Sequence, residues 1–96
     1  MLVLVTYDVQ TSSISGEKRL RKVARQCVNY GQRVQNSVFE CIVNPAQFAE
    51  LKHRLSEIID KEKDSIRFYF LGSKWERKVE SLGVVTSYDP NSELII

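Results

Sequence analysis

The run Leu2-Val3-Leu4-Val5, near the start of the chain, is the feature that most constrains the fold. A strand with one face in water alternates apolar and polar residues, but this run is apolar at every position. It therefore predicts a strand at residues 2–8 that is covered on both faces. A chain of 96 residues has room for one domain with a single core, so a partner subunit would help to cover such a strand.

Hydrophobic periodicity along the rest of the chain predicts two helices and four further strands. The first helix is expected at residues 16–30, before the helix stop Gly31. The second begins with Asn44 as N-cap and Pro45 in the first turn, and runs to about residue 62. The further strands are expected at residues 33–35, 38–43, 64–72 and 79–83.

This order of elements matches the split βαβ arrangement of an α+β, ferredoxin-like βαββαβ fold with an extra C-terminal strand. Two helices can cover only one face of the antiparallel sheet, yet the first and fourth strands are apolar on both faces. We therefore expect the sheet faces of two subunits to pack together in a homodimer. Residues 1–83 are expected to form the domain, and residues 84–96 a C-terminal tail that docks on the partner subunit.

Composition places the chain among globular proteins, with 43% hydrophobic and 27% charged residues. The longest apolar run, residues 1–5, is far shorter than the roughly 20 residues of a membrane span, and no basic segment precedes it. We therefore expect a cytoplasmic protein with no membrane partner. Cys27 and Cys41 lack zinc-site spacing and are expected to be reduced core residues. His53 is expected at the surface.

Asp8, at the end of the first strand, carries the main functional signal. If Val3, Val5 and Tyr7 face the helices, Asp8 points toward the open face at the rim of the proposed interface. One carboxylate is a poor metal site, but a nearby two-fold axis supplies a second copy, and Mg²⁺ commonly takes one or two carboxylates together with water. The alternative is that Asp8 ends the strand by bonding to its own turn.

The first predicted helix carries five basic side chains away from its apolar stripe. Such a face suits phosphates. Only Glu17 lies among the basic residues, so local ion pairing does not neutralise them. The alternative is an ordinary solvated helix surface. The five residues are Lys18, Arg19, Arg21, Lys22 and Arg25.

The remaining polar candidates lie on the predicted strands. Arg33 is placed to make paired bonds to a phosphate, or to serve as an ordinary interface arginine. Phe39 fits a core position better than a stacking platform. Glu40 and Arg67 share the open-face parity and are expected to pair across the sheet or the interface. The chain lacks a glycine-rich phosphate loop and a nucleophile elbow, so hydrolysis would depend on metal-activated water.

Three segments in order, the strand ending in YDV, then RVQNSVFEC, then DSIRFYFLG, resemble the small CRISPR-associated endonuclease family that works with the integrase in spacer adaptation. The resemblance implies a ferredoxin-like homodimer in which Asp8 of both subunits holds a divalent metal, Mg²⁺ or Mn²⁺, for cleavage of nucleic acid. It also implies a catalytic role for Tyr7 and nucleic-acid binding by Arg33 and Phe39. Arg19 and Arg21 correspond only through similar basic helix character.

The first hypothesis is thus an Mg²⁺-dependent endonuclease that cleaves double-stranded DNA. Duplex DNA is favoured because exposed aromatic residues that would stack on unpaired bases are not evident. Single-stranded RNA is the alternative substrate. A second hypothesis is a noncatalytic DNA-binding adapter that bridges integrase dimers, with the tail as an integrase contact. A third is a ferredoxin-like regulatory dimer that binds a small ligand and fails to retain DNA even at low salt.

Overall fold

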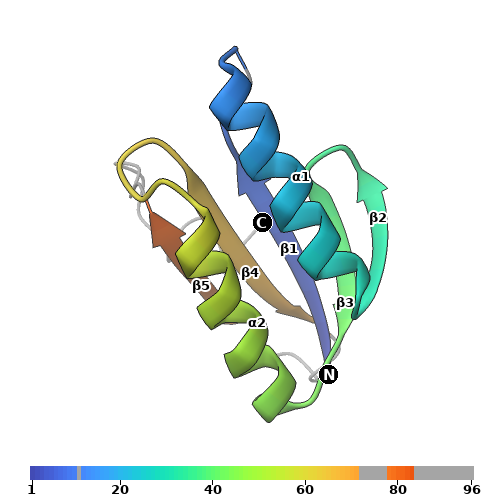
Figure 1. Cartoon of the computed structure of the whole chain (residues 1–96). Coiled ribbons are helices and arrows are strands. Elements are labelled where there is room, and N and C mark those ends of the chain that lie inside the picture. The colour runs from blue at the N-terminus through green and yellow to red at the C-terminus, as the bar shows by residue number, and fades with distance from the viewer. Residues whose placement is uncertain (11, 72–77, 84–96) are drawn as a thin grey trace.

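The computed structural model shows a five-stranded antiparallel sheet with both helices on one face (Figure 1). It describes residues 1–10, 12–71 and 78–83, so the predicted tail at residues 84–96 lies outside the described residues. The elements along the chain are β1 (Leu2–Asp8), α1 (Ile14–Val28), β2 (Gly31–Gln35), β3 (Val38–Ile42), α2 (Pro45–Ile58), β4 (Ser65–Leu71) and β5 (Lys78–Gly83).

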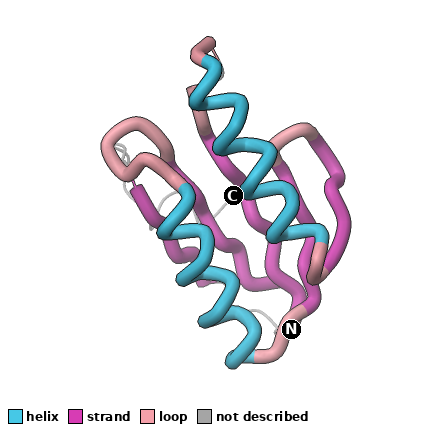
Figure 2. The backbone as a smooth tube through the Cα atoms, viewed as in Figure 1, coloured by secondary structure: helices cyan, strands magenta, loops and turns pink. Residues whose placement is uncertain are grey.

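The strands follow the order β2-β3-β1-β4-β5 across the sheet. β1 is central, and its Val5 lies opposite Phe39 of β3 and Phe68 of β4. The first four strands have the ferredoxin-like order, and β5 extends the sheet beyond β4. Both helices lie against the same side of the sheet (Figure 2). The predicted α+β fold with an extra C-terminal strand is therefore confirmed.

The hydrophobic core lies between the sheet and the helices. Alternate residues of β1 enter it as predicted: Val3 and Val5 are fully buried and Tyr7 is 2% exposed. Cys27 and Cys41 are free and buried, also as predicted. The Phe48 ring packs edge-on against Phe68, with the ring centroids 5.2 Å apart. The helices contribute their predicted apolar stripes, Leu20, Val23, Ala24 and Cys27 from α1 and Phe48, Leu51 and Leu55 from α2.

The first helix starts two residues earlier than predicted because Ser13 caps it. The Ser13 hydroxyl accepts a hydrogen bond of 3.0 Å from the Gly16 amide. A Cβ atom on Gly16 would lie 1.7 Å from the Gln10 carbonyl oxygen, so a glycine lets the loop after β1 pack directly on the first turn.

The second helix starts as predicted, with Asn44 and Gln47 forming a capping box. It ends at Ile58, four residues before the predicted end, because Ile59 is extended, with ψ 157°. The Asp64 carboxylate and the Asp60 carbonyl then hold the following turn.

The second face of the sheet is left uncovered by the described elements. Its apolar side chains include Ile42, which is 71% exposed, and Leu71, which is 36% exposed. Leu2, Leu4 and Tyr69 share this face by register and are half-buried. This is the apolar second face that the sequence predicts for β1 and β4. Within the described part of the chain, neither α1 nor α2 has the length and apolar character of a membrane-spanning helix.

Candidate active site

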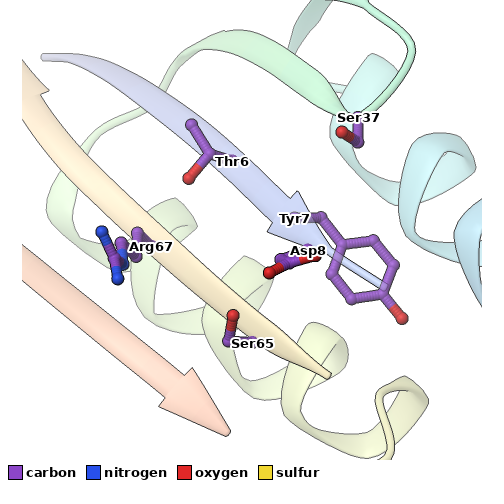
Figure 3. Close-up of a pocket in the computed structure, with 6 residues that line it drawn as sticks. All are labelled: Thr6, Tyr7, Asp8, Ser37, Ser65 and Arg67. Atoms are coloured by element: carbon purple, nitrogen blue, oxygen red, sulfur yellow. The ribbon is translucent and has the colours of Figure 1, made fainter. Parts of the chain in front are cut away.

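Asp8 lies at the end of β1 on the uncovered face, beside a shallow pocket of about 340 Å³ (Figure 3). In the register of β1 and β4, Asp8 is opposite Ser65 and Thr6 is opposite Arg67. Because cross-strand partners share a face, all four side chains stand on the same side of the sheet. Ser37 completes the rim from the β2–β3 turn, and its carbonyl accepts a hydrogen bond of 2.9 Å from the Tyr7 amide.

The Asp8 carboxylate is exposed, and no hydrogen bond or ion pair joins it to the following turn or to any other described residue. Carboxylate and hydroxyl oxygens are suitable ligands for Mg²⁺. However, no three His, Cys, Asp or Glu side chains gather among residues 1–10, 12–71 and 78–83. The described residues of one chain therefore do not supply a complete metal site, and Asp8 is the one exposed carboxylate at this pocket.

Behind Asp8, on the helix-covered face, Tyr7, Arg19 and Asp64 form a buried network. The Asp64 carboxylate accepts hydrogen bonds from the Tyr7 hydroxyl at 2.6 Å, from Arg19 Nε at 2.6 Å and from Arg19 Nη2 at 3.1 Å. The Asp60 amide donates a further bond of 3.0 Å. These residues join the end of β1, the first turns of α1 and the start of β4. The network therefore fixes the part of the fold that presents Asp8.

The residues of this network shift the pKa values of one another. Burial raises the pKa of Asp64, but the hydrogen bonds from Arg19, Tyr7 and the Asp60 amide together lower it by more. The pKa of Asp64 therefore lies below its ordinary value. Burial, and then the Asp64 carboxylate, raise the pKa of Tyr7. The hydrogen bonds to Asp64 raise the pKa of Arg19. At neutral pH the network is thus an arginine–carboxylate ion pair with a neutral phenol.

The structure corrects one expectation from the sequence and adds a contact to another predicted residue. Arg19 was expected to face solvent with the other basic residues of α1, but its side chain is only 14% exposed and is paired with Asp64. The Tyr7 hydroxyl lies on the opposite face from the Asp8 carboxylate and donates to Asp64, so it holds the end of β1 in place, while its catalytic role stays a prediction. The sequence prediction overlooked Asp64, although it opens the quoted segment DSIRFYFLG.

The predicted strand residues Phe39, Arg33 and Glu40 lie in three different environments. Phe39 is fully buried, as its core interpretation predicts, and so offers no surface for stacking a base. Arg33 donates to the Asn36 carbonyl at 2.7 Å, and its guanidinium carbon lies 5.5 Å from the Phe39 ring centroid, so it braces the β2–β3 turn. Glu40 accepts a hydrogen bond from Gln32 at 3.2 Å, and its pairing with Arg67 across a subunit interface stays a prediction.

Four of the five predicted basic residues are exposed on α1, as the sequence indicates. They form a basic stripe, which consists of Lys18, Arg21, Lys22 and Arg25. This stripe belongs to the helical layer, whereas the Asp8 carboxylate points to the other face of the sheet.

Comparison with known proteins identifies close relatives. A family model described as "CRISPR associated protein Cas2" matches residues 1–79. The CRISPR-associated endonuclease Cas2 of Halalkalibacterium halodurans is 61% identical over 95 residues, 99% of each chain. The CRISPR-associated endoribonuclease Cas2 of Nitratidesulfovibrio vulgaris is 56% identical over 96 residues, covering 100% of this chain and 94% of that protein. The crystal structure of Streptococcus pyogenes Cas2 at pH 6.5 superposes with a TM-score of 0.75 and 67% identity, over 78% of this chain and 90% of that one.

Proposed function

Because the chain belongs to the CRISPR-associated Cas2 family, we propose that it is a metal-dependent endonuclease. Its proposed substrate is double-stranded DNA, which it cleaves in spacer adaptation. The active form is a homodimer in which Asp8 of both subunits holds one Mg²⁺ ion, with Mn²⁺ able to replace it. Its protein partner is the adaptation integrase, and residues 84–96 dock either on the partner subunit or on the integrase.

The observation that carries this proposal is the state of Asp8. An aspartate at the end of a buried strand is exposed, has no partner among the described residues and borders a pocket lined with hydroxyls. A carboxylate without a structural partner is available as a ligand. The endonuclease and endoribonuclease names of the relatives support nuclease chemistry for such a site.

The uncovered sheet face supports the homodimer. Its apolar side chains, including Ile42 at 71% exposure, would lose contact with water when a second copy packs on this face. Asp8 lies on the same face at the end of the central strand. A two-fold contact across this face can therefore bring two Asp8 carboxylates together.

Each part of the chain has a separate task in the proposed reaction. A divalent metal, when bound, would supply an activated water and polarise the phosphate. Asp8 holds and orients the metal, while the Arg19–Asp64–Tyr7 network keeps the end of β1 in place. The basic stripe on α1 contacts backbone phosphates independently of sequence.

Single-stranded RNA is the second candidate substrate, because the relative from Nitratidesulfovibrio vulgaris is named an endoribonuclease. Duplex DNA is favoured since the described surface offers cations for a phosphate backbone, while Phe39, which the resemblance assigns to nucleic-acid binding, is buried as its core interpretation predicts. The two substrates would use the same Asp8 site.

The test is a cleavage assay of the full chain on matched duplex DNA and single-stranded RNA, with Mg²⁺ and with a chelator. Wild-type protein should cut the duplex only with Mg²⁺, and Asp8→Asn should abolish cleavage while the dimer persists. The matched control is Glu62→Gln, which removes one exposed carboxylate from a turn away from the pocket and should cleave as wild type.

Unchanged cleavage by Asp8→Asn would refute the metal mechanism. Preferential cleavage of RNA would assign the second substrate. Tight duplex binding without cleavage by wild-type protein would instead identify a noncatalytic adapter.

A further inference from the structure

The basic stripe on α1 leaves an electrostatic problem at Asp8. The stripe lies in the helical layer, whereas the Asp8 carboxylate points to the uncovered face. A carboxylate repels a phosphate oxyanion unless positive charge stands beside it. A cationic side chain on the uncovered face would therefore reduce this repulsion, in addition to the proposed metal.

Arg67 is placed to supply that charge. It lies opposite Thr6 in the β1–β4 register, two positions along β4 from the residue opposite Asp8, so it is a diagonal neighbour of Asp8. Long side chains reach across such diagonals. Arg67 also lines the pocket beside Asp8 (Figure 3). Its planar guanidinium can donate two parallel hydrogen bonds to a phosphate.

Neutral donors surround the same pocket. The hydroxyls of Thr6, Ser37 and Ser65 line it from β1, the β2–β3 turn and β4. In the described part of the chain, none of these hydroxyls makes a side-chain hydrogen bond. Hydroxyl groups at strand ends and turns commonly donate to phosphate oxygens. One arginine and several hydroxyls beside the exposed Asp8 carboxylate therefore bring together donors that suit a phosphodiester.

We propose that Arg67, with the hydroxyls of Ser65 and Ser37, binds the scissile phosphate beside Asp8. This assignment rests on the proposed endonuclease function. It extends that function by giving the basic stripe and Arg67 different roles in phosphate binding. The basic stripe holds the backbone at a distance from the cleaved bond, and Arg67 holds the reacting group itself. Loss of Arg67 should therefore affect the chemical step more strongly than substrate affinity.

The experiment measures kcat and KM for the full chain on duplex DNA with Mg²⁺. Arg67→Gln should lower kcat by about 100-fold with little change in KM. Arg67→Lys, which keeps the charge but loses the paired geometry, should recover part of that loss. The matched control Arg21→Gln, on the basic stripe, should raise KM and leave kcat near the wild-type value. Circular dichroism and dimer mass verify that each variant is folded.

Ser65→Ala provides a second, milder variant and should lower kcat about fivefold. Wild-type kcat in both Arg67→Gln and Ser65→Ala would overturn the subsite, while inactivity of Asp8→Asn would leave the proposed function standing. If Arg67→Gln does not fold, wild-type kcat in Ser65→Ala and Arg67→Lys overturns it equally.

A protein that cleaves nothing would refute the proposed function, and the subsite is then tested by titration with inorganic phosphate. Phosphate should shift the backbone amide NMR signals of Asp8 and Ser65 in wild-type protein but not in Arg67→Gln. Absence of shifts in the wild type would overturn the subsite independently.

Discussion

Arg19 and Asp64 form a two-point ion pair although they lie 45 residues apart in the chain, with Nε–Oδ2 at 2.6 Å and Nη2–Oδ1 at 3.1 Å. Asp64 is fully buried and Arg19 is 14% exposed. The pair joins α1 to the start of β4, and Tyr7 adds the end of β1 through the same carboxylate. The residue next to Asp8 is thus fixed by a contact on the opposite face of the sheet.

Asp64→Asn should strongly destabilise the fold. The substitution removes the buried charge that Arg19 and Tyr7 need, so we expect the free energy of unfolding to fall by about 3 kcal/mol. Urea denaturation followed by circular dichroism measures this change. Glu62→Gln, an exposed neighbour in the same turn, serves as the control and should have little effect. Equal stability of both variants would show that the network is not a major contact.

Arg19 and Arg21 should differ sharply, although both are basic residues of α1. Arg21→Ala should weaken duplex binding and reduce the slope of log K against log salt by about 1, because an exposed phosphate contact is lost. Arg19→Ala should instead lower stability and leave that slope unchanged, since its guanidinium is held by Asp64. Binding titrations at several salt concentrations, below the melting temperature of both variants, measure the difference. A reduced slope for Arg19→Ala would mean that Arg19 contacts the nucleic acid after all.

Stability should depend on pH through Asp64 at the acidic end. The pKa of Asp64 is lowered in the folded state from an ordinary value of 3.8. Its contribution is therefore present above that ordinary value and is lost as pH falls toward the lower folded-state pKa. The test measures the urea midpoint at several values between pH 2 and pH 7. As the pH is lowered below about 4, the midpoint should decrease more steeply for wild type than for Asp64→Asn. Parallel curves would contradict this assignment.

Tyr7 should contribute at the alkaline end. The pKa of Tyr7 is raised from an ordinary value of 10.0 by burial and by the Asp64 carboxylate. A raised pKa favours the neutral phenol in the folded state, so this contribution is present below the ordinary value and is lost as pH rises above it. Tyr7→Phe removes the titrating group and should flatten the loss of stability above pH 10. The urea midpoint at rising pH is the measurement, and an unchanged alkaline loss in Tyr7→Phe would assign it to other groups.

Ile42→Glu should weaken the proposed homodimer. Ile42 is 71% exposed on the uncovered sheet face, so a charge there is tolerated in the monomer but is costly in an apolar interface. We expect the dimer dissociation constant to rise about tenfold or more, as measured by sedimentation equilibrium. The control Ile14→Glu changes an isoleucine of similar exposure, 75%, on α1 and should leave the dimer intact. A stable dimer in Ile42→Glu would place the interface elsewhere.

Much of the fold was predictable because its signals are local. The run Leu2-Val3-Leu4-Val5 marked the central strand, and the 3.6-residue stripes marked both helices. Alternation along β1 also predicted correctly that Asp8 and Tyr7 point to opposite faces. The end of α2 was missed because the Asp64 carboxylate, rather than a stop signal within the helix, holds the turn that follows.

Local periodicity was enough to assign each residue to one face of its strand or helix, because the periods of strand and helix are fixed by backbone geometry. It placed Asp8 on the apolar second face of a central strand. The folded chain was needed to show that Arg19 is paired with Asp64 while Arg21 is exposed, and that Arg67 is a diagonal neighbour of Asp8. These outcomes depend on strand register and on the packing of segments far apart in the chain, which no local pattern of residues encodes.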